Sequence, residues 1–177
     1  AWDREADTVT ICRIMLHDEY DRKGTVWADD HSMSVPVSRL RHEVVLVAPL
    51  GTAPMVVTQT HTLLTASQAE GEPDIPTVAV VYPQMSAPVR RAARLLASQF
   101  QRRGIGFQAF PIEGLRDAES TEACETFIRA LVDALEAVRD RYPDKEVALS
   151  LSGGRKAMSA LTLFAAQRAG IQRLYHT

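Results

Sequence analysis

A short segment near the carboxyl end of the chain carries residue types that bind phosphate. Residues 149–152 read as the end of a buried strand, and Gly153, Gly154, Arg155 and Lys156 follow them at the start of a helical stretch. Glycines let backbone N–H groups approach an anion closely, and the N-terminus of a helix carries partial positive charge. Because Arg155 and Lys156 add two full charges, the segment is suited to hold phosphate.

The same segment also has a simpler structural interpretation. Ser152 could cap the following helix while the two cations are merely solvated. A single Gly-Gly turn is a weak motif and does not decide between the two interpretations by itself.

A second glycine-bearing segment favours phosphate binding. It follows the first apolar run after residue 42 and opens another helical stretch, and it consists of Leu50, Gly51, Thr52, Ala53 and Pro54. Thr52 can cap that helix, Pro54 suits its first position, and Gly51 permits close approach of a ligand.

Strands and helices alternate from residue 43 onward. Apolar runs predict strands at 43–49, 77–82, 105–110, 146–151 and 171–176, and the stretches between them predict helices at 54–70, 88–103, 120–141 and 156–169. Such alternation implies right-handed crossovers and a largely parallel sheet. The predicted fold class is therefore α/β, a doubly wound, Rossmann-like and mostly parallel sheet with helices on both faces.

The order of strands decides which loops meet. In a sheet of order 3-2-1-4-5 the first and fourth strands are neighbours, and ligands bind in the crevice beyond their carboxyl ends. This order would place the loop at 50–54 beside the loop at 152–156. Gln84 follows the second strand, where its side chain could contact a base or ribose, although a surface turn explains it more simply.

Residues 1–42 differ from the rest of the chain. Apolar runs predict strands at 8–16 and 24–28, which together suggest a small N-terminal β-extension, either a hairpin or a linker to a further segment. The predicted Rossmann-like domain then spans residues 43–177.

Composition and motifs exclude several classes of function. The net charge of −2 argues against a general DNA- or RNA-binding protein, so a polyanion would have to enter a local pocket. Cys12 and Cys124 fit neither a disulfide framework nor a zinc site, which favours a reduced, cytosolic setting. The chain lacks G-x-G-x-x-G after the first strand and lacks a P-loop. No nucleophile–base pair or metal-ligand spacing stands out, so no catalytic residue and no metal are predicted.

The two glycine-bearing segments resemble those of CRISPR-associated Rossmann-fold (CARF) domains. Residues 50–54 followed by Val-Val-Thr-Gln-Thr at 56–60 look like the opening of such a domain, and residues 152–159 (SGGRKAMS) closely resemble the second diagnostic motif of one CARF branch. The resemblance covers about residues 43–177 and leaves residues 1–42 unplaced.

The resemblance implies a sensor of cyclic oligoadenylates, the second messengers of type III CRISPR antiviral defence. CARF domains are homodimers that bind the ring across the two-fold axis. Arg155 and Lys156 from two protomers would supply four cations, which matches the four phosphates of cyclic tetra-adenylate. The residues expected to contact the ring are Leu50, Gly51, Thr52, Ala53, Pro54, Ser152, Gly153, Gly154, Arg155, Lys156, Met158 and Ser159, with Gln84 added from its position alone.

Three functions from different classes remain open at this point. The first is a sensor that regulates an effector outside this chain, such as a membrane helix upstream of Ala1 that would tether a cytoplasmic domain to the inner membrane. The second is a metal-independent ring nuclease that aligns a ribose 2′-OH with the phosphorus. The third is a generic nucleotide-binding Rossmann domain.

Overall fold

The computed structural model describes residues 2–3, 8–9, 13–14, 43–66 and 73–176. Its strands are β1 (Trp2–Asp3), β2 (Thr8–Val9), β3 (Arg13–Ile14), β4 (Glu43–Pro49), β5 (Asp74–Pro83), β6 (Gly106–Ile112), β7 (Glu146–Ser150) and β8 (Arg173–His176). Its helices are α1 (Met55–Ala66), α2 (Ala87–Arg102), α3 (Thr121–Arg141) and α4 (Lys156–Ala169).

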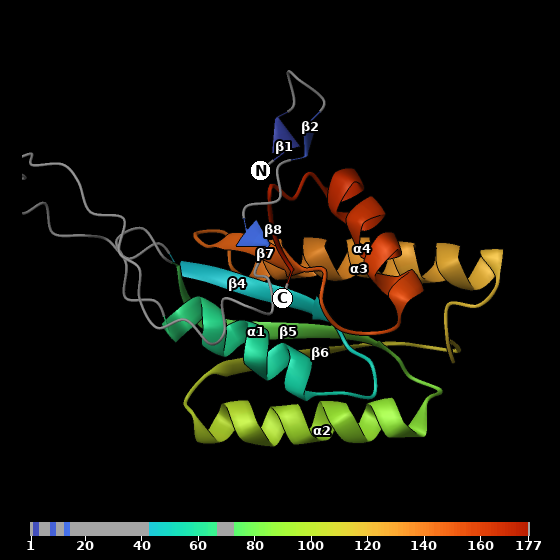
Figure 1. Ribbon diagram of the computed structural model, residues 1–177, viewed down its shortest axis with the longest axis horizontal. Coiled ribbons are helices and arrows are strands. Elements are labelled where there is room, and N and C mark those ends of the chain that lie inside the picture. The colour runs from blue at the N-terminus through green and yellow to red at the C-terminus, as the bar shows by residue number, and fades with distance from the viewer. Residues whose placement is uncertain (1, 4–7, 10–12, 15–42, 67–72, 177) are drawn as a thin grey trace, which may run out of the picture.

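The main sheet has the order β3-β8-β7-β4-β5-β6, and every neighbouring pair in it is parallel. From β4 to β8 this is the predicted order 3-2-1-4-5, so the doubly wound fold class is confirmed. Helices α1 and α2 cover one face of the sheet, and α3 and α4 cover the other (Figure 1). Strand β4 therefore lies at the centre, with β5 on one side and β7 on the other.

Two apolar cores flank the sheet because side chains alternate along each strand. In β4, Val45 and Val47 pack with α3 and α4, whereas Val44 and Leu46 pack with α1 and α2. All four side chains are fully buried. A strand that is buried on both faces reads as one continuous apolar run, which is why the sequence predicts it well.

Strand β5 begins three residues earlier than the predicted strand at 77–82. Its pairing with β4 shifts between Glu43 and Val45, which pair with Asp74 and Thr77, so β5 carries one extra residue there. Pro76 lies in this bulge. A proline is normally excluded from a central strand because it cannot donate to the ladder, and a bulge is a place that tolerates it.

The N-terminal prediction overlaps only a few described residues. Strands β1 and β2 pair antiparallel, and β3 pairs parallel with β8. The predicted strand at 8–16 overlaps β2 and β3, whereas the one at 24–28 lies outside the described residues. The N-terminal extension and its boundary at residue 42 therefore stay predictions. Among the helices that the structure describes, none combines the length and apolar character needed to cross a bilayer.

One histidine is buried in the core. His61 of α1 is 3% exposed, its Nε2 lies 3.0 Å from the carbonyl oxygen of Ile75, and its ring meets Phe100 edge-on. The Nδ1 atom has no hydrogen-bond partner. Burial is the main cause that lowers the pKa of His61, and the positive charge of Arg103 adds to the effect. His61 is therefore neutral in the folded protein near neutral pH.

This buried histidine makes stability depend on pH. Its pKa is lower in the folded state, so the unfolded state binds more protons once the pH falls below about 6.5. We expect the free energy of unfolding to be about 1 kcal/mol lower at pH 5.5 than at pH 7.5 through this group. Urea unfolding at both values measures it. His61→Gln should remove this part of the dependence, and His176→Gln, at an exposed site, should keep it; equal slopes in all three proteins would contradict the assignment.

Candidate functional site

The two glycine-bearing loops lie against each other at the carboxyl edge of the sheet. A Cβ atom added to Gly51 would lie 2.8 Å from the Cα of Gly154. A Cβ atom added to Gly153 would overlap the carbonyl oxygen of Pro49, the last residue of β4. The predicted juxtaposition of the loops after β4 and β7 is therefore present, and the glycines allow their backbones to touch.

This contact explains why glycine is needed at these positions, which the sequence alone did not show. We predicted that they admit a ligand, whereas the structure shows that they are needed for the loops to pack. Gly153 and Gly154 also have φ values of 115° and 70°, which favour glycine. Contact of these glycines with a ligand stays a prediction.

Hydrogen bonds to the side chains of Ser150 and Met158 stabilise the turn between β7 and α4. The Ser150 Oγ accepts the N–H of Ser152 at 3.1 Å and donates to the carbonyl oxygen of Ser152 at 3.0 Å. Met158 is 2% exposed, and its sulfur accepts the N–H of Arg155 at 3.4 Å. The residue at the N-cap of α4 is Arg155. The alternative interpretation with Ser152 as the cap is therefore wrong, because Ser152 lies three residues too early and is buried.

The loop after β4 is anchored by its first residue. Leu50 is fully buried in the core beneath α1, and its N–H donates to the carbonyl oxygen of Val81 at 2.9 Å. Its side chain is therefore covered in this chain, and its contact with a ligand stays a prediction. Thr52 and Ala53 are exposed, and Pro54 directly precedes α1 and accepts the N–H of Val57 at 3.1 Å. The exposed part of this loop is thus residues 52–53, beside the Gly51–Gly154 contact.

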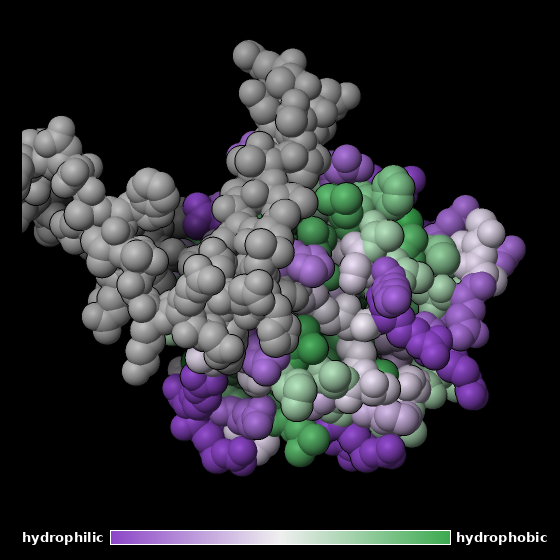
Figure 2. All heavy atoms as spheres, in the orientation of Figure 1, coloured by the Kyte–Doolittle hydropathy of each residue, from purple (hydrophilic) through white to green (hydrophobic). Residues whose placement is uncertain are grey.

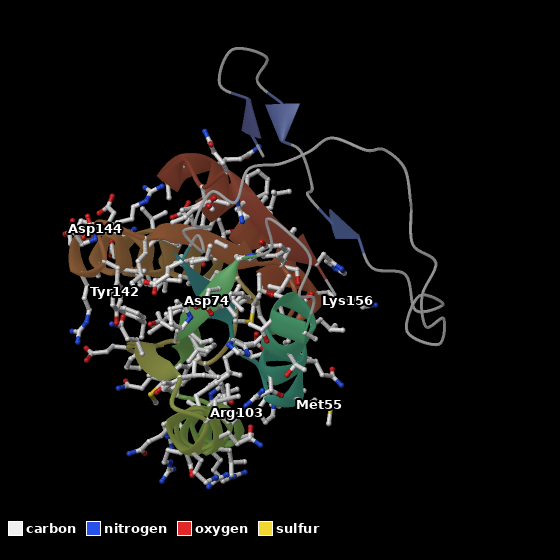
Figure 3. All side chains as sticks on the ribbon, turned by 90° about the vertical axis from the view of Figure 1, so that its left-hand side faces the viewer. Met55, Asp74, Arg103, Tyr142, Asp144 and Lys156 are labelled. Carbon is white, nitrogen blue, oxygen red and sulfur yellow. The ribbon has the colours of Figure 1, made fainter. Side chains whose placement is uncertain are left out.

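The two cations of the second loop have different surroundings. The Arg155 Nη1 forms ion pairs with Asp117 and with Glu119, the latter at 2.6 Å. Lys156 is exposed and has no ion pair with any described residue. Figure 3 shows it on the side of the molecule opposite Tyr142 and Asp144. Lys156 is therefore an available cation at this edge, and Ser159 follows it on the first turn of α4, half-buried.

Gln84 lies at the same edge, on the far side of β4 from the second loop. Its N–H donates to the carbonyl oxygen of Ile112 at 3.1 Å, and its own carbonyl oxygen accepts from Arg90 Nη1 at 2.5 Å. These bonds fix its backbone and leave a half-exposed side chain. Its role toward a ligand stays a prediction.

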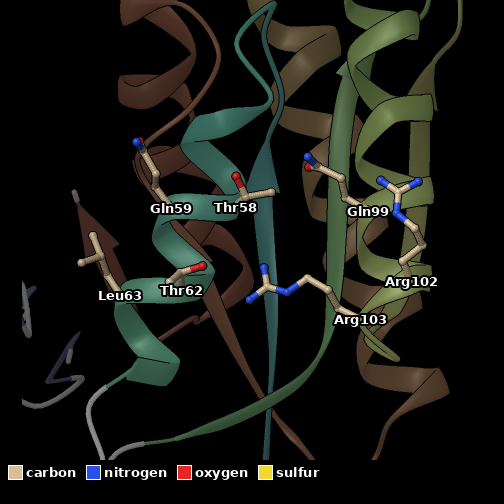
Figure 4. A pocket seen from close by; sticks show the side chains of 7 residues that line it. All are labelled: Thr58, Gln59, Thr62, Leu63, Gln99, Arg102 and Arg103. Carbon is tan, nitrogen blue, oxygen red and sulfur yellow. The ribbon is translucent and has the colours of Figure 1, made fainter.

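A separate groove lies between α1 and α2. It has a volume of about 370 Å³ and is lined by Thr58, Gln59, Thr62, Leu63, Gln99, Arg102 and Arg103. Figure 4 shows Arg103 extending from the end of α2 toward α1 across this groove. It shares no lining residue with the two glycine-bearing loops.

Comparison with known proteins identifies the family and the fold. The model of the CRISPR-associated protein family NE0113 (Cas_NE0113) matches residues 53–177. This span contains the whole of the second loop and the end of the first. No curated protein matches the sequence.

Two solved structures share the fold. Protein VC1899 from Vibrio cholerae is 12% identical with a TM-score of 0.53, and the match covers 75% of this chain and 30% of that one. Enterococcus italicus Csm6 bound to cyclic hexa-2′-fluoro-hexa-dAMP is 13% identical with a TM-score of 0.52, and the match covers 77% of this chain and 33% of that one. The chain thus spans about a third of the length of either protein.

The resemblance to CRISPR-associated Rossmann-fold domains is thereby confirmed at the level of family and fold. The family model covers most of the chain, and the sheet has the predicted Rossmann-like order. The chain belongs to the NE0113 family of CRISPR-associated proteins and is a CARF-like domain.

Proposed function

We propose that this chain is the cyclic oligoadenylate sensor of a type III CRISPR antiviral system, with cyclic tetra-adenylate as its ring. The observation that carries the proposal is the contact between Gly51 and Gly154, because it brings two loops and the N-terminus of α4 together at one edge. Lys156 stands at that edge as an exposed cation. A helix N-terminus with an adjacent cation is suited to bind phosphate.

Family membership and fold support this reading. The chain is CRISPR-associated, and the Csm6 structure of the same fold holds a cyclic oligonucleotide of six units. A ring of four adenylates has the two-fold symmetry needed to lie on the axis of a homodimer. Two protomers would then present two Lys156 and two Arg155 side chains to four phosphates.

The outer face of α4 supports the homodimer. On the inner face of α4, Met158 and Ala165 are buried in the core. On the opposite face, Ala157, Ala160 and Phe164 are exposed, and the exposed fraction of Phe164 is 57%. Figure 2 shows hydrophobic side chains gathered where α4 lies. An exposed apolar stripe on a helix is typical of a surface that binds another protein chain. The ring and the dimer contact would therefore share one helix, with the ring at its N-terminus.

Phe164→Asp should convert the dimer to a monomer. The substitution places a charge in a contact that is proposed to exclude water, which opposes association. Sedimentation velocity measures the outcome. Leu95→Asp is the matched control, because Leu95 is a similarly exposed apolar residue (59%) on α2, away from α4. A monomeric unmodified protein, or a dimer that survives Phe164→Asp, would contradict this interface.

Calorimetric titration tests the proposed function directly. The protein is titrated with cyclic tri-, tetra- and hexa-adenylate, and linear tetra-adenylate serves as the control. Tight binding of one cyclic tetra-adenylate per two chains is the expected result. Binding of hexa-adenylate alone would correct the ring size, and no binding to any ring would leave a generic nucleotide-binding domain. Chromatography of the bound ring separates a sensor, which returns it intact, from a ring nuclease, which opens it.

The sensor would act on an effector outside this chain. One form that fits is a membrane helix upstream of Ala1, which would tether a cytoplasmic sensor to the inner membrane. Ring binding could favour one arrangement of the two protomers only through a difference in affinity for the two arrangements. Deletion of residues 1–42 from the complete protein should leave ring binding intact and abolish the effector response; loss of binding would contradict this division.

A further inference from the structure

The loop between β6 and α3 carries two carboxylates, Asp117 and Glu119, that contact Arg155 of the second glycine loop. The Arg155 guanidinium contacts both through one nitrogen, Nη1, whose two N–H groups meet Asp117 Oδ2 and Glu119 Oε1. Both N–H groups of that nitrogen are thus engaged. A guanidinium binds phosphate best with a whole edge of two parallel N–H groups, and Nη1 belongs to one of its edges.

The loop that supplies the carboxylates is firmly held. Leu115 and Ala118 on either side of Asp117 are 5% and 7% exposed and pack in the core beneath α3 and α4. The carbonyl oxygen of Leu115 accepts the N–H of Met85 at 2.9 Å, just beyond the end of β5. The second carboxylate oxygen of Asp117 accepts the N–H of Ala118 at 2.9 Å. The position of Asp117 is therefore fixed by the fold.

The charges of the two cations and of the two carboxylates cancel. Arg155 and Lys156 supply two positive charges, and Asp117 and Glu119 supply two negative charges, so the four groups sum to zero. A phosphate that approaches Arg155 meets a cation already paired with an anion. It must either displace the carboxylates or bind beside them against their repulsion.

We propose that Asp117 and Glu119 are an internal counter-anion for Arg155, which an anionic ligand must displace, and that they set the ligand affinity of this site. The proposal rests on the proposed function, because it assumes that the ligand is an anion bound at the two glycine loops. It assigns affinity-setting roles to two residues outside both loops. They keep the empty site from attracting phosphates indiscriminately.

The test compares cyclic tetra-adenylate affinity in the unmodified protein and in the double variant Asp117→Asn, Glu119→Gln. Asn and Gln keep the side-chain shape and remove the charge. We expect the double variant to bind roughly five- to tenfold more tightly at low salt, because Arg155 is released and repulsion is lost. The gain should shrink as salt screens these partly exposed charges.

A charge-matched control separates this local effect from net charge. Glu113→Gln, Glu125→Gln changes the net charge by the same amount at two exposed acidic residues that do not contact Arg155. It should alter affinity less than twofold. Glu119→Gln alone should show part of the gain in affinity. Because the Glu119 side chain is 74% exposed, this single substitution does not disturb the core.

The outcomes distinguish this inference from the proposed function. If the unmodified protein binds the ring and the double variant binds equally or more weakly, the counter-anion is wrong while the sensor stands. If the control variant gains as much as the double variant, the effect is net charge and the inference also fails. If no protein in the series binds any ring, the proposed function is wrong, and the inference that rests on it is wrong as well.

Discussion

Lys156→Ala is expected to weaken cyclic tetra-adenylate binding on the order of a hundredfold or more. A hydrogen bond to a charged partner contributes about 1.5–3 kcal/mol, and a ring on a two-fold axis meets Lys156 from both protomers. One substitution therefore removes two such contacts. Arg155 does not replace them, because it is paired with Asp117 and Glu119 in the free protein and would contact phosphates of its own once the ring is bound. Titration of the variant with cyclic tetra-adenylate measures the loss.

Arg94→Ala is the matched control for this prediction. Arg94 is an exposed cation on α2, away from α4 and from its outer face. Its removal should leave ring affinity within about twofold, the size of a screened long-range effect. Unchanged affinity in Lys156→Ala, or an equal loss in Arg94→Ala, would contradict the placement of the phosphates at the N-terminus of α4.

Gly153→Ala should destabilise the protein by about 3 kcal/mol or more. Its φ of 115° is a conformation that residues with a side chain rarely adopt, and the added Cβ would overlap the carbonyl oxygen of Pro49. Relief of that overlap requires β4 and the turn after β7 to separate. Because those segments form the proposed ring site, the variant should lose ring binding as well as stability. Urea unfolding measures the first effect and titration the second.

Gly104→Ala separates backbone strain from the overlap. Gly104 also has a positive φ, 69°, but an added Cβ would meet nothing within 4 Å. Its substitution should cost about 1 kcal/mol, the penalty of a left-handed conformation alone. Equal losses of stability in Gly104→Ala and Gly153→Ala would mean that the overlap with the Pro49 carbonyl oxygen adds no cost at Gly153.

Much of the fold could be predicted because the core strands are buried on both faces. Strand β4 is a continuous apolar run that begins after the polar Glu43 and leads to the turn at Gly51, and such runs between helical stretches specify a parallel sheet. The strand order then placed the loops at 50–54 and 152–156 together. Pro76 hid the start of β5, because a proline signals the end of a strand unless a bulge accommodates it.

The electrostatics of the site could not be predicted in the same way. Arg155 is separated from Asp117 by 38 residues and from Glu119 by 36, and no periodicity in the sequence links them. The exposed acidic residues around α3, Glu119 among them, read as a solvated surface. The contact of Asp117 and Glu119 with Arg155 depends on how the loop before α3 packs against the start of α4, which is a tertiary property.

The central pairing of β4 with β7 has a consequence for protein synthesis. Val45 pairs with Val147, so the two glycine loops come from opposite ends of the described Rossmann-like domain. Contacts between distant parts of a chain form late, and a growing chain emerges from the ribosome N-terminus first. The site therefore cannot assemble before β7 has been made. An unfinished or prematurely terminated chain would lack it and could not bind the proposed ligand.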